Sequence, residues 1–158
     1  MSRPKRIVVA HGDARARHMI AWALRRDGHE VVEASNGGEV VSLLATLAIH
    51  SEHMPDLLVM AERLRGWTGT DLLTGLQDTE WAVPCIIVVH AGEARACDVA
   101  IEQGALAAVE WPFDLMRMRD VVRMAMRSHR ASAHPPSHAH ARGGVRKHDG
   151  QPGSSVRA

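Results

Sequence analysis

Short runs of residues that are apolar on both faces constrain this chain more than any other feature. Three are nearly unbroken: residues 6–10 read RIVVA, residues 56–61 read DLLVMA and residues 84–89 read PCIIVV. A short strand that is apolar on both faces is typical of a parallel sheet covered by helices on both sides. Weaker runs at residues 29–34 and 106–109 complete a set of five expected strands.

Helical patterns separate these runs. Asp13 can cap a helix that ends near Asp27, with Gly28 as its stop. One face of that helix is expected to carry Ala16, Met19, Ile20, Ala23 and Leu24. Further helices are expected after Asn36, after Gly69, over residues 94–103 and after Pro112. The alternation predicts an α/β fold, a doubly wound five-stranded parallel sheet of (βα)5 type. Sites in such folds gather at the carboxyl ends of the strands.

The composition changes near residue 129. Residues 130–158 hold five cations, Arg130, Arg142, Arg146, Lys147 and Arg157, and one anion, Asp149. The net charge is +1 for all 158 residues, so residues 130–158 carry +4 and residues 1–129 carry −3. With few large apolar residues, residues 130–158 cannot offset the entropy cost of folding. We therefore expect one domain over residues 1–129 and a disordered, basic, His-rich tail over residues 130–158.

Several classes of protein are disfavoured. The near balance of charge argues against a globally basic nucleic-acid binder. No apolar run approaches the ~20 residues of a membrane span, and the run at residues 7–10 is too short for a signal peptide. We expect a cytoplasmic protein without membrane association. Cys85 and Cys97 fit no disulfide framework or CxxC pair and are interpreted as reduced packing thiols.

The strand ends carry the informative residues. They read His11-Gly12-Asp13, Ala61-Glu62, Val89-His90 and Glu110-Trp111-Pro112-Phe113. With the segments at residues 28–37, 55–60 and 102–105, this layout resembles the receiver domain of two-component response regulators over about residues 6–127. The resemblance implies a flavodoxin-like receiver fold.

The resemblance also assigns roles to positions. In that family two acidic residues after the first strand hold Mg²⁺, and an aspartate ending the third strand takes a phosphoryl group. A hydroxyl residue ending the fourth strand and a lysine before the proline bind the phosphoryl oxygens. These positions map onto His11 and Gly12, Ala61, Val89, and Trp111, and the switch aromatic of the fifth strand maps onto Ala108. Every one differs from the family pattern.

The side chains at these positions lack the groups needed for phosphoryl transfer and Mg²⁺ binding. Alanine offers no nucleophile at residue 61, and neither His11 nor Gly12 supplies a carboxylate for Mg²⁺. Val89 and Trp111 leave no hydroxyl or cation to meet phosphoryl charge. The hypothesis is a stand-alone pseudo-receiver with no enzymatic activity, cofactor or metal. It would act by binding a signalling protein, either a histidine kinase or another component of a phosphorelay-related pathway.

Other functions stay open at this stage. Asp13 or Glu62 could replace the lost phosphoacceptor, and His11, His90, Asp13 and Glu62 could converge on a transition metal. The tail could bind metal or nucleic acid through its charge and its histidines, His134, His138, His140 and His148. The tail has no aromatic residue for stacking on bases, which argues against sequence-specific recognition.

Candidate partner-binding residues lie in three places. Trp22 is expected on the outer side of the first helix, and Trp67 in the loop after the third strand. Arg119 and Arg123 are expected on a basic outer face of the last helix. In the resembling family the last helices often mediate dimers, which implies a possible homodimer through this face. Trp111 is the candidate for a plug that fills the vacant phosphorylation site.

Overall fold

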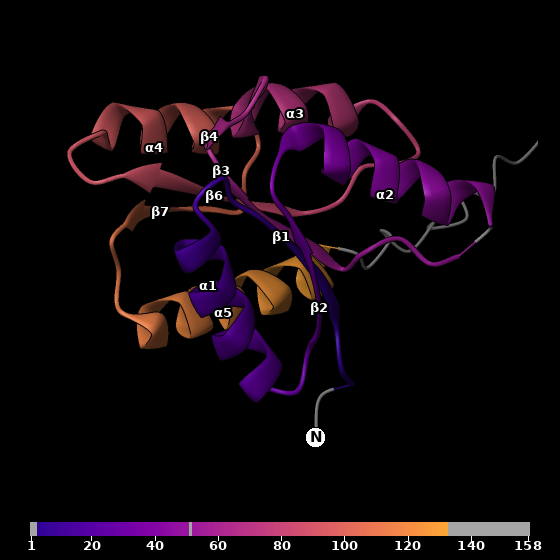
Figure 1. Ribbon diagram of the computed structural model, residues 1–158, viewed down its shortest axis with the longest axis horizontal. Helices are drawn as coiled ribbons and strands as arrows, with labels where there is room; N and C mark the ends of the chain where they lie inside the picture. Colours follow the sequence, from indigo (N-terminus) through magenta and orange to yellow (C-terminus); the bar gives the residue numbers. More distant parts are fainter. Residues whose placement is uncertain (1–2, 51, 133–158) are drawn as a thin grey trace, which may run out of the picture.

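A five-stranded parallel sheet lies between two layers of helices in the computed structural model, which describes residues 3–50 and 52–132 (Figure 1). The strands of the sheet run in the order β2-β1-β3-β6-β7. Their bounds are β1 Arg6–Ala10, β2 Glu30–Ala34, β3 Leu57–Ala61, β6 Cys85–His90 and β7 Ala107–Trp111. The α/β, doubly wound class predicted from the apolar runs is confirmed.

The helices divide between the two faces of the sheet. One face is covered by α1 (Ala14–Arg26) and α5 (Leu115–Ser132). The other is covered by α2 (Gly37–Ile49), α3 (Gly69–Gln77) and α4 (Ala94–Glu102). Among the residues that the structure describes, no helix is both long and apolar enough to cross a membrane.

Alternation along each strand builds two hydrophobic clusters. Side chains point to opposite faces at successive positions, so Ile7 and Val9 pack under α1 and α5, while Val8 and Ala10 pack under α2, α3 and α4. Because both faces are covered, strand residues on both faces are buried. This arrangement explains why β1, β3 and β6 read as continuous apolar runs.

The structure corrects the expectations at two points. Residues 63–68, expected as a plain loop, form an antiparallel hairpin of β4 (Arg63–Leu64) and β5 (Trp67–Thr68), with Gly66 at φ +77° in its turn. Met19 was expected on the inner face of α1 but is 39% exposed. Helix α5 ends at Ser132, and the expected division of the chain at residue 129 stays a prediction. The expected tail falls, beyond Ser132, outside the described residues and stays a prediction.

An ion pair fastens α5 to the end of α1. The Asp27 carboxylate, at the C-cap of α1, accepts from Arg119 Nε with both oxygens at 2.8 Å and from Arg123 Nη2 at 3.4 Å. The hydrogen bond from Arg119 lowers the pKa of Asp27. The two arginines expected to serve a partner are thus engaged within the domain.

Candidate functional site

The carboxyl edge of the sheet brings the mapped positions together. His11 follows β1, Ala61 ends β3, Val89 lies near the end of β6, and Trp111 ends β7. The register of β3, β6 and β7 places these strand ends side by side, because Ala61 pairs with Val88 and His90 pairs with Trp111. Ala61 is only 4% exposed and Val89 is fully buried.

His11 is a buried imidazole whose Nδ1 is used in a hydrogen bond. Its Nδ1 accepts the backbone N–H of Asp13 at 3.0 Å, so the ring proton is assigned to Nε2. Its carbonyl oxygen accepts from Arg17 Nη1 at 2.8 Å. Burial lowers the pKa of His11 below 6.5, outweighing the nearby charge of Asp13, which raises it. A histidine side chain is neutral or cationic, so the first mapped position supplies no carboxylate to hold a cation.

Trp111 contacts two other rings. Its indole meets the Phe113 ring at a centroid distance of 4.9 Å and an interplanar angle of 86°. It also meets the His11 ring edge-on. It packs against the hydrophobic cluster beneath α1 and α5, whereas Ala61 and Val89 belong to the cluster on the other face. Trp111 thus joins the ends of β1 and β7 by ring packing.

The two carboxylates considered as substitutes are both engaged. Asp13 caps α1, accepting the backbone N–H of Arg15 at 2.8 Å and that of Ala16 at 3.1 Å, and the pKa of Asp13 is lowered by these bonds. Glu62 accepts the backbone N–H of Thr70 at 3.0 Å and its hydroxyl at 2.7 Å. Across residues 3–50 and 52–132 the structure forms no cluster of three or more His, Cys, Asp or Glu side chains placed to hold a metal. The hypothesis that His11, His90, Asp13 and Glu62 converge on a metal is not supported.

Two contacts that sequence reasoning missed connect the loops around the site. Arg63 of the hairpin forms an ion pair with Glu93, which lies just before α4. Trp67 packs over the start of α2, where a Cβ added to Gly37 would come within 2.6 Å of the Trp67 ring. Trp67 is still 47% exposed. Trp67 therefore packs the hairpin against α2, while about half of its side chain stays accessible to solvent.

A cavity of ≈ 490 Å³ lies beside Ala108, the mapped switch position. It is lined by Cys97, Ala108, Glu110, Pro112, Phe113 and Arg117. Burial, followed by the charges of Glu110 and Asp98, raises the pKa of the Cys97 thiol. A thiol with a raised pKa is a poor nucleophile, which fits the interpretation of Cys97 as a packing thiol.

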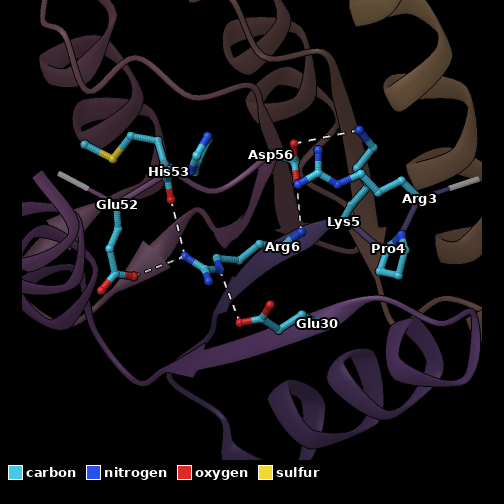
Figure 2. A pocket seen from close by; sticks show the side chains of 9 residues that line it. Arg3, Pro4, Lys5, Arg6, Glu30, Glu52, His53 and Asp56 are labelled. Carbon is cyan, nitrogen blue, oxygen red and sulfur yellow. Dashed lines mark hydrogen bonds and ion pairs between the residues drawn. The ribbon is translucent and has the colours of Figure 1, made fainter. Parts of the chain in front are cut away.

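A second cavity, of ≈ 370 Å³, lies at the opposite, amino edge of the sheet (Figure 2). Five of the charged side chains that line it form ion pairs with one another. The Arg6 guanidinium lies 3.2 Å from Glu30 and 3.7 Å from Glu52, and Lys5 lies 3.8 Å from Asp56. These pairs tie the connection between α2 and β3 to the start of β1, so the cavity is interpreted as structural.

The sequence and fold identify the family. Residues 7–123 match the response regulator receiver domain, so the chain belongs to that family of two-component signalling. The chain is 27% identical over 124 residues to the transcriptional regulatory protein PdtaR of Mycobacterium tuberculosis, covering 78% of this chain but only 57% of that protein. It is 24% identical over 119 residues to the sporulation initiation phosphotransferase F of Bacillus subtilis, covering 75% of this chain and 91% of that protein.

Solved structures agree on the fold. A response regulator receiver domain protein from Clostridium thermocellum superposes with a TM-score of 0.69 at 20% identity, covering 81% of this chain and 98% of that one. A putative response regulator from Chloroflexus aurantiacus gives a TM-score of 0.71 at 21% identity, covering 79% of this chain and 99% of that one. The receiver fold expected from the strand-end motifs is confirmed.

Proposed function

We propose that this receiver domain does not accept a phosphoryl group and acts by binding a protein partner in its signalling pathway. The observation that carries the proposal is Ala61. It ends β3, where the family pattern has the phosphoacceptor aspartate, and it presents a buried methyl group. A methyl group cannot form an acyl phosphate.

The neighbouring residues support the same reading. His11 uses Nδ1 in a backbone hydrogen bond, and Gly12 has no side chain, so neither position supplies a carboxylate to Mg²⁺. Val89 and Trp111 replace the hydroxyl and the cation. Of the alternative acceptors, Asp13 accepts both cap hydrogen bonds of α1 through Oδ1, and Glu62 accepts from Thr70 through both of its oxygens. Formation of an acyl phosphate at either residue would disrupt these hydrogen bonds.

The partner surface that we propose is the carboxyl edge together with the outer side of α1. Trp22 and Trp67 are the two exposed tryptophans there, and aromatic side chains dominate many protein interfaces. The partner would be a histidine kinase or another pathway component. A homodimer through α4 and α5 stays a weaker prediction, because Arg119 and Arg123 already bind Asp27.

The proposal is tested by binding with and without a phosphodonor. The tagged full chain is used to capture partners, and one purified partner is then titrated with the chain before and after treatment with acetyl phosphate and Mg²⁺. A receiver with a complete site is treated in parallel to verify the reagent. We expect the same dissociation constant under both conditions. Binding that appears only after treatment would overturn the proposal.

A further inference from the structure

The cavity beside Ala108 lies at one edge of the sheet and joins residues of three elements. β7 is the outermost strand on that side, with α4 on one face of the sheet and α5 on the other (Figure 1). The volume of ≈ 490 Å³ falls within the range of about 300–1,000 Å³ that is typical of small-ligand sites. We call this space the Ala108 cavity. Its lining residues are Cys97 of α4, Ala108 and Glu110 of β7, Pro112 and Phe113 of the following loop, and Arg117 of α5.

Two of these residues belong to different layers of the core. Ala108 packs against the hydrophobic cluster beneath α2, α3 and α4, whereas Phe113 packs against the cluster beneath α1 and α5. The Phe113 ring is held by its edge-to-face contact with Trp111, at a centroid distance of 4.9 Å. A ring that is already held in place loses little side-chain entropy when a ligand covers it. A side chain larger than alanine at residue 108 would reduce the space beside it.

Two opposite charges line the Ala108 cavity without neutralising each other. Glu110 and Arg117 are both exposed, and neither forms an ion pair within 4.0 Å in the part of the chain that the structure describes. The cavity at the amino edge differs in this respect, because five of its charged side chains are paired with one another. The Ala108 cavity therefore offers both a carboxylate and a guanidinium to a ligand.

The remaining lining is uncharged. Burial, and next the charge of Glu110, raises the pKa of the Cys97 thiol, so the thiol stays protonated near neutral pH. Ala108, Pro112 and Phe113 add a methyl group, a pyrrolidine ring and a phenyl ring. The site thus combines one anion, one cation and an apolar wall.

We propose that the Ala108 cavity binds a free amino acid with an apolar side chain. The ligand carboxylate pairs with Arg117, its ammonium group pairs with Glu110, and its side chain lies against Phe113 and Ala108. Each charge of the ligand then meets a charge that the domain leaves unpaired. The inference goes beyond the proposed function, because it gives a domain without a phosphoacceptor a small molecule to respond to.

Other classes of small ligand fit these charges less well. A nucleotide or a free phosphate would bring several negative charges beside Glu110. An amine without a carboxylate would leave Arg117 unpaired, and a carboxylate without an amine would leave Glu110 unpaired. A zwitterion satisfies both residues at once.

The test titrates three related probes into the full chain and follows amide NMR shifts. L-phenylalanine carries both charges, 3-phenylpropanoate lacks the ammonium group, and phenethylamine lacks the carboxylate. For L-phenylalanine we expect saturable shifts in β7 and the start of α5, with a dissociation constant on the order of 1 mM for a ligand of this size. Each analogue should bind roughly 2- to 5-fold more weakly, the usual contribution of one exposed ion pair.

Variants assign each charge to its partner. Arg117→Gln should weaken binding of L-phenylalanine by roughly 2- to 5-fold and leave binding of phenethylamine, which has no carboxylate, unchanged. Glu110→Gln should weaken L-phenylalanine by a similar factor and leave 3-phenylpropanoate unchanged. Arg95→Gln and Glu102→Gln make the same changes at exposed residues of α4 outside both cavities and should have no effect.

Ala108→Phe tests the cavity itself. The side chain should occupy the space and remove saturable binding of L-phenylalanine. The family pattern has an aromatic residue at this position, so we expect the variant to fold, and circular dichroism verifies this for every variant.

Several results would overturn the inference. These are the absence of saturable shifts with L-phenylalanine up to about 20 mM, well above the expected dissociation constant, equal or tighter binding of either analogue, and unchanged binding by Ala108→Phe. An equal loss with the α4 controls would also overturn it. A phosphoryl adduct on the chain would refute the proposed function instead and would leave these titrations of the untreated protein unaffected.

Discussion

The Trp111 indole meets the His11 imidazole edge-on, with ring centroids 6.2 Å apart and ring planes at 63°. The family pattern has a lysine and an acidic residue at these two positions, one to bind phosphoryl oxygens and the other to bind Mg²⁺. Here both positions carry uncharged rings. The two rings form a packing contact between the ends of β1 and β7.

Replacing Trp111 should destabilise the fold. Trp111→Ala removes the ring contacts with Phe113 and His11 and leaves a gap at the edge of the sheet, so we expect a loss of about 1–3 kcal/mol in the free energy of unfolding. Urea unfolding measures the change. Trp22→Ala, at an exposed position, is the matched control and should cost less than about 0.5 kcal/mol. Equal losses for the two variants would contradict the packing role of Trp111.

His11 should make the protein less stable in mild acid. Burial holds the pKa of His11 below 6.5 in the folded state, so the unfolded chain binds the proton more readily. Stability is therefore complete above about pH 7 and falls as the pH drops through 6.5 toward the folded pKa. His29, whose pKa burial also lowers, acts in the same direction.

Urea midpoints between pH 7.5 and pH 5 measure this slope. His11→Gln should make it shallower, while His50→Gln, at an exposed position, should leave it unchanged. An NMR titration of the His11 imidazole gives the pKa directly. A value at or above 6.5 would refute the prediction.

Removing the carboxylate of Asp27 should loosen α5. Asp27→Asn weakens the charge-assisted hydrogen bonds from Arg119 and Arg123 at a side chain that is only 7% exposed. We expect a lower urea midpoint, and faster amide exchange in α5. Asp120→Asn, which removes an exposed carboxylate 3.9 Å from Arg123, should have the smaller effect. The reverse order would mean that Asp27 does not fasten the two helices.

Mg²⁺ and beryllofluoride should leave the conformation unchanged. Receivers switch by coupling the phosphorylated aspartate, a hydroxyl and an aromatic residue, and Ala61, Val89 and Ala108 remove all three groups. We expect amide NMR spectra that do not change at millimolar Mg²⁺ with beryllofluoride. A receiver with a complete site serves as the positive control. Shift changes across the carboxyl edge and β7 would show that a switch remains.

The fold could be predicted because its determinants are local. The apolar runs of β1, β3 and β6 predict buried strands, and Asp13 predicts the start of α1, where it caps the helix as expected. The mapping of the phosphoacceptor position onto Ala61 also needs only the sequence, because Ala61 lies at the end of an apolar strand run, and it stays a prediction.

Long-range side-chain contacts could not be predicted in this way. Nothing local in the sequence pairs Asp27 with Arg119, which is 92 residues away. The hairpin at residues 63–68 is too short to produce an alternating pattern, and Met19 lies at the margin of the inner face of α1. The packing of Trp67 on Gly37 depends on that hairpin, so it too required the structure.

The central claim, that no phosphoryl group is accepted, is tested most directly by the intact mass of the full chain after incubation with acetyl phosphate and Mg²⁺. Phosphorylation adds HPO₃, about 80 Da. With Ala61 in place of the acceptor, and Asp13 and Glu62 engaged in hydrogen bonds, the mass should stay that of the untreated chain. A stoichiometric adduct of about 80 Da, at Asp13, Glu62 or any other residue, would contradict the claim.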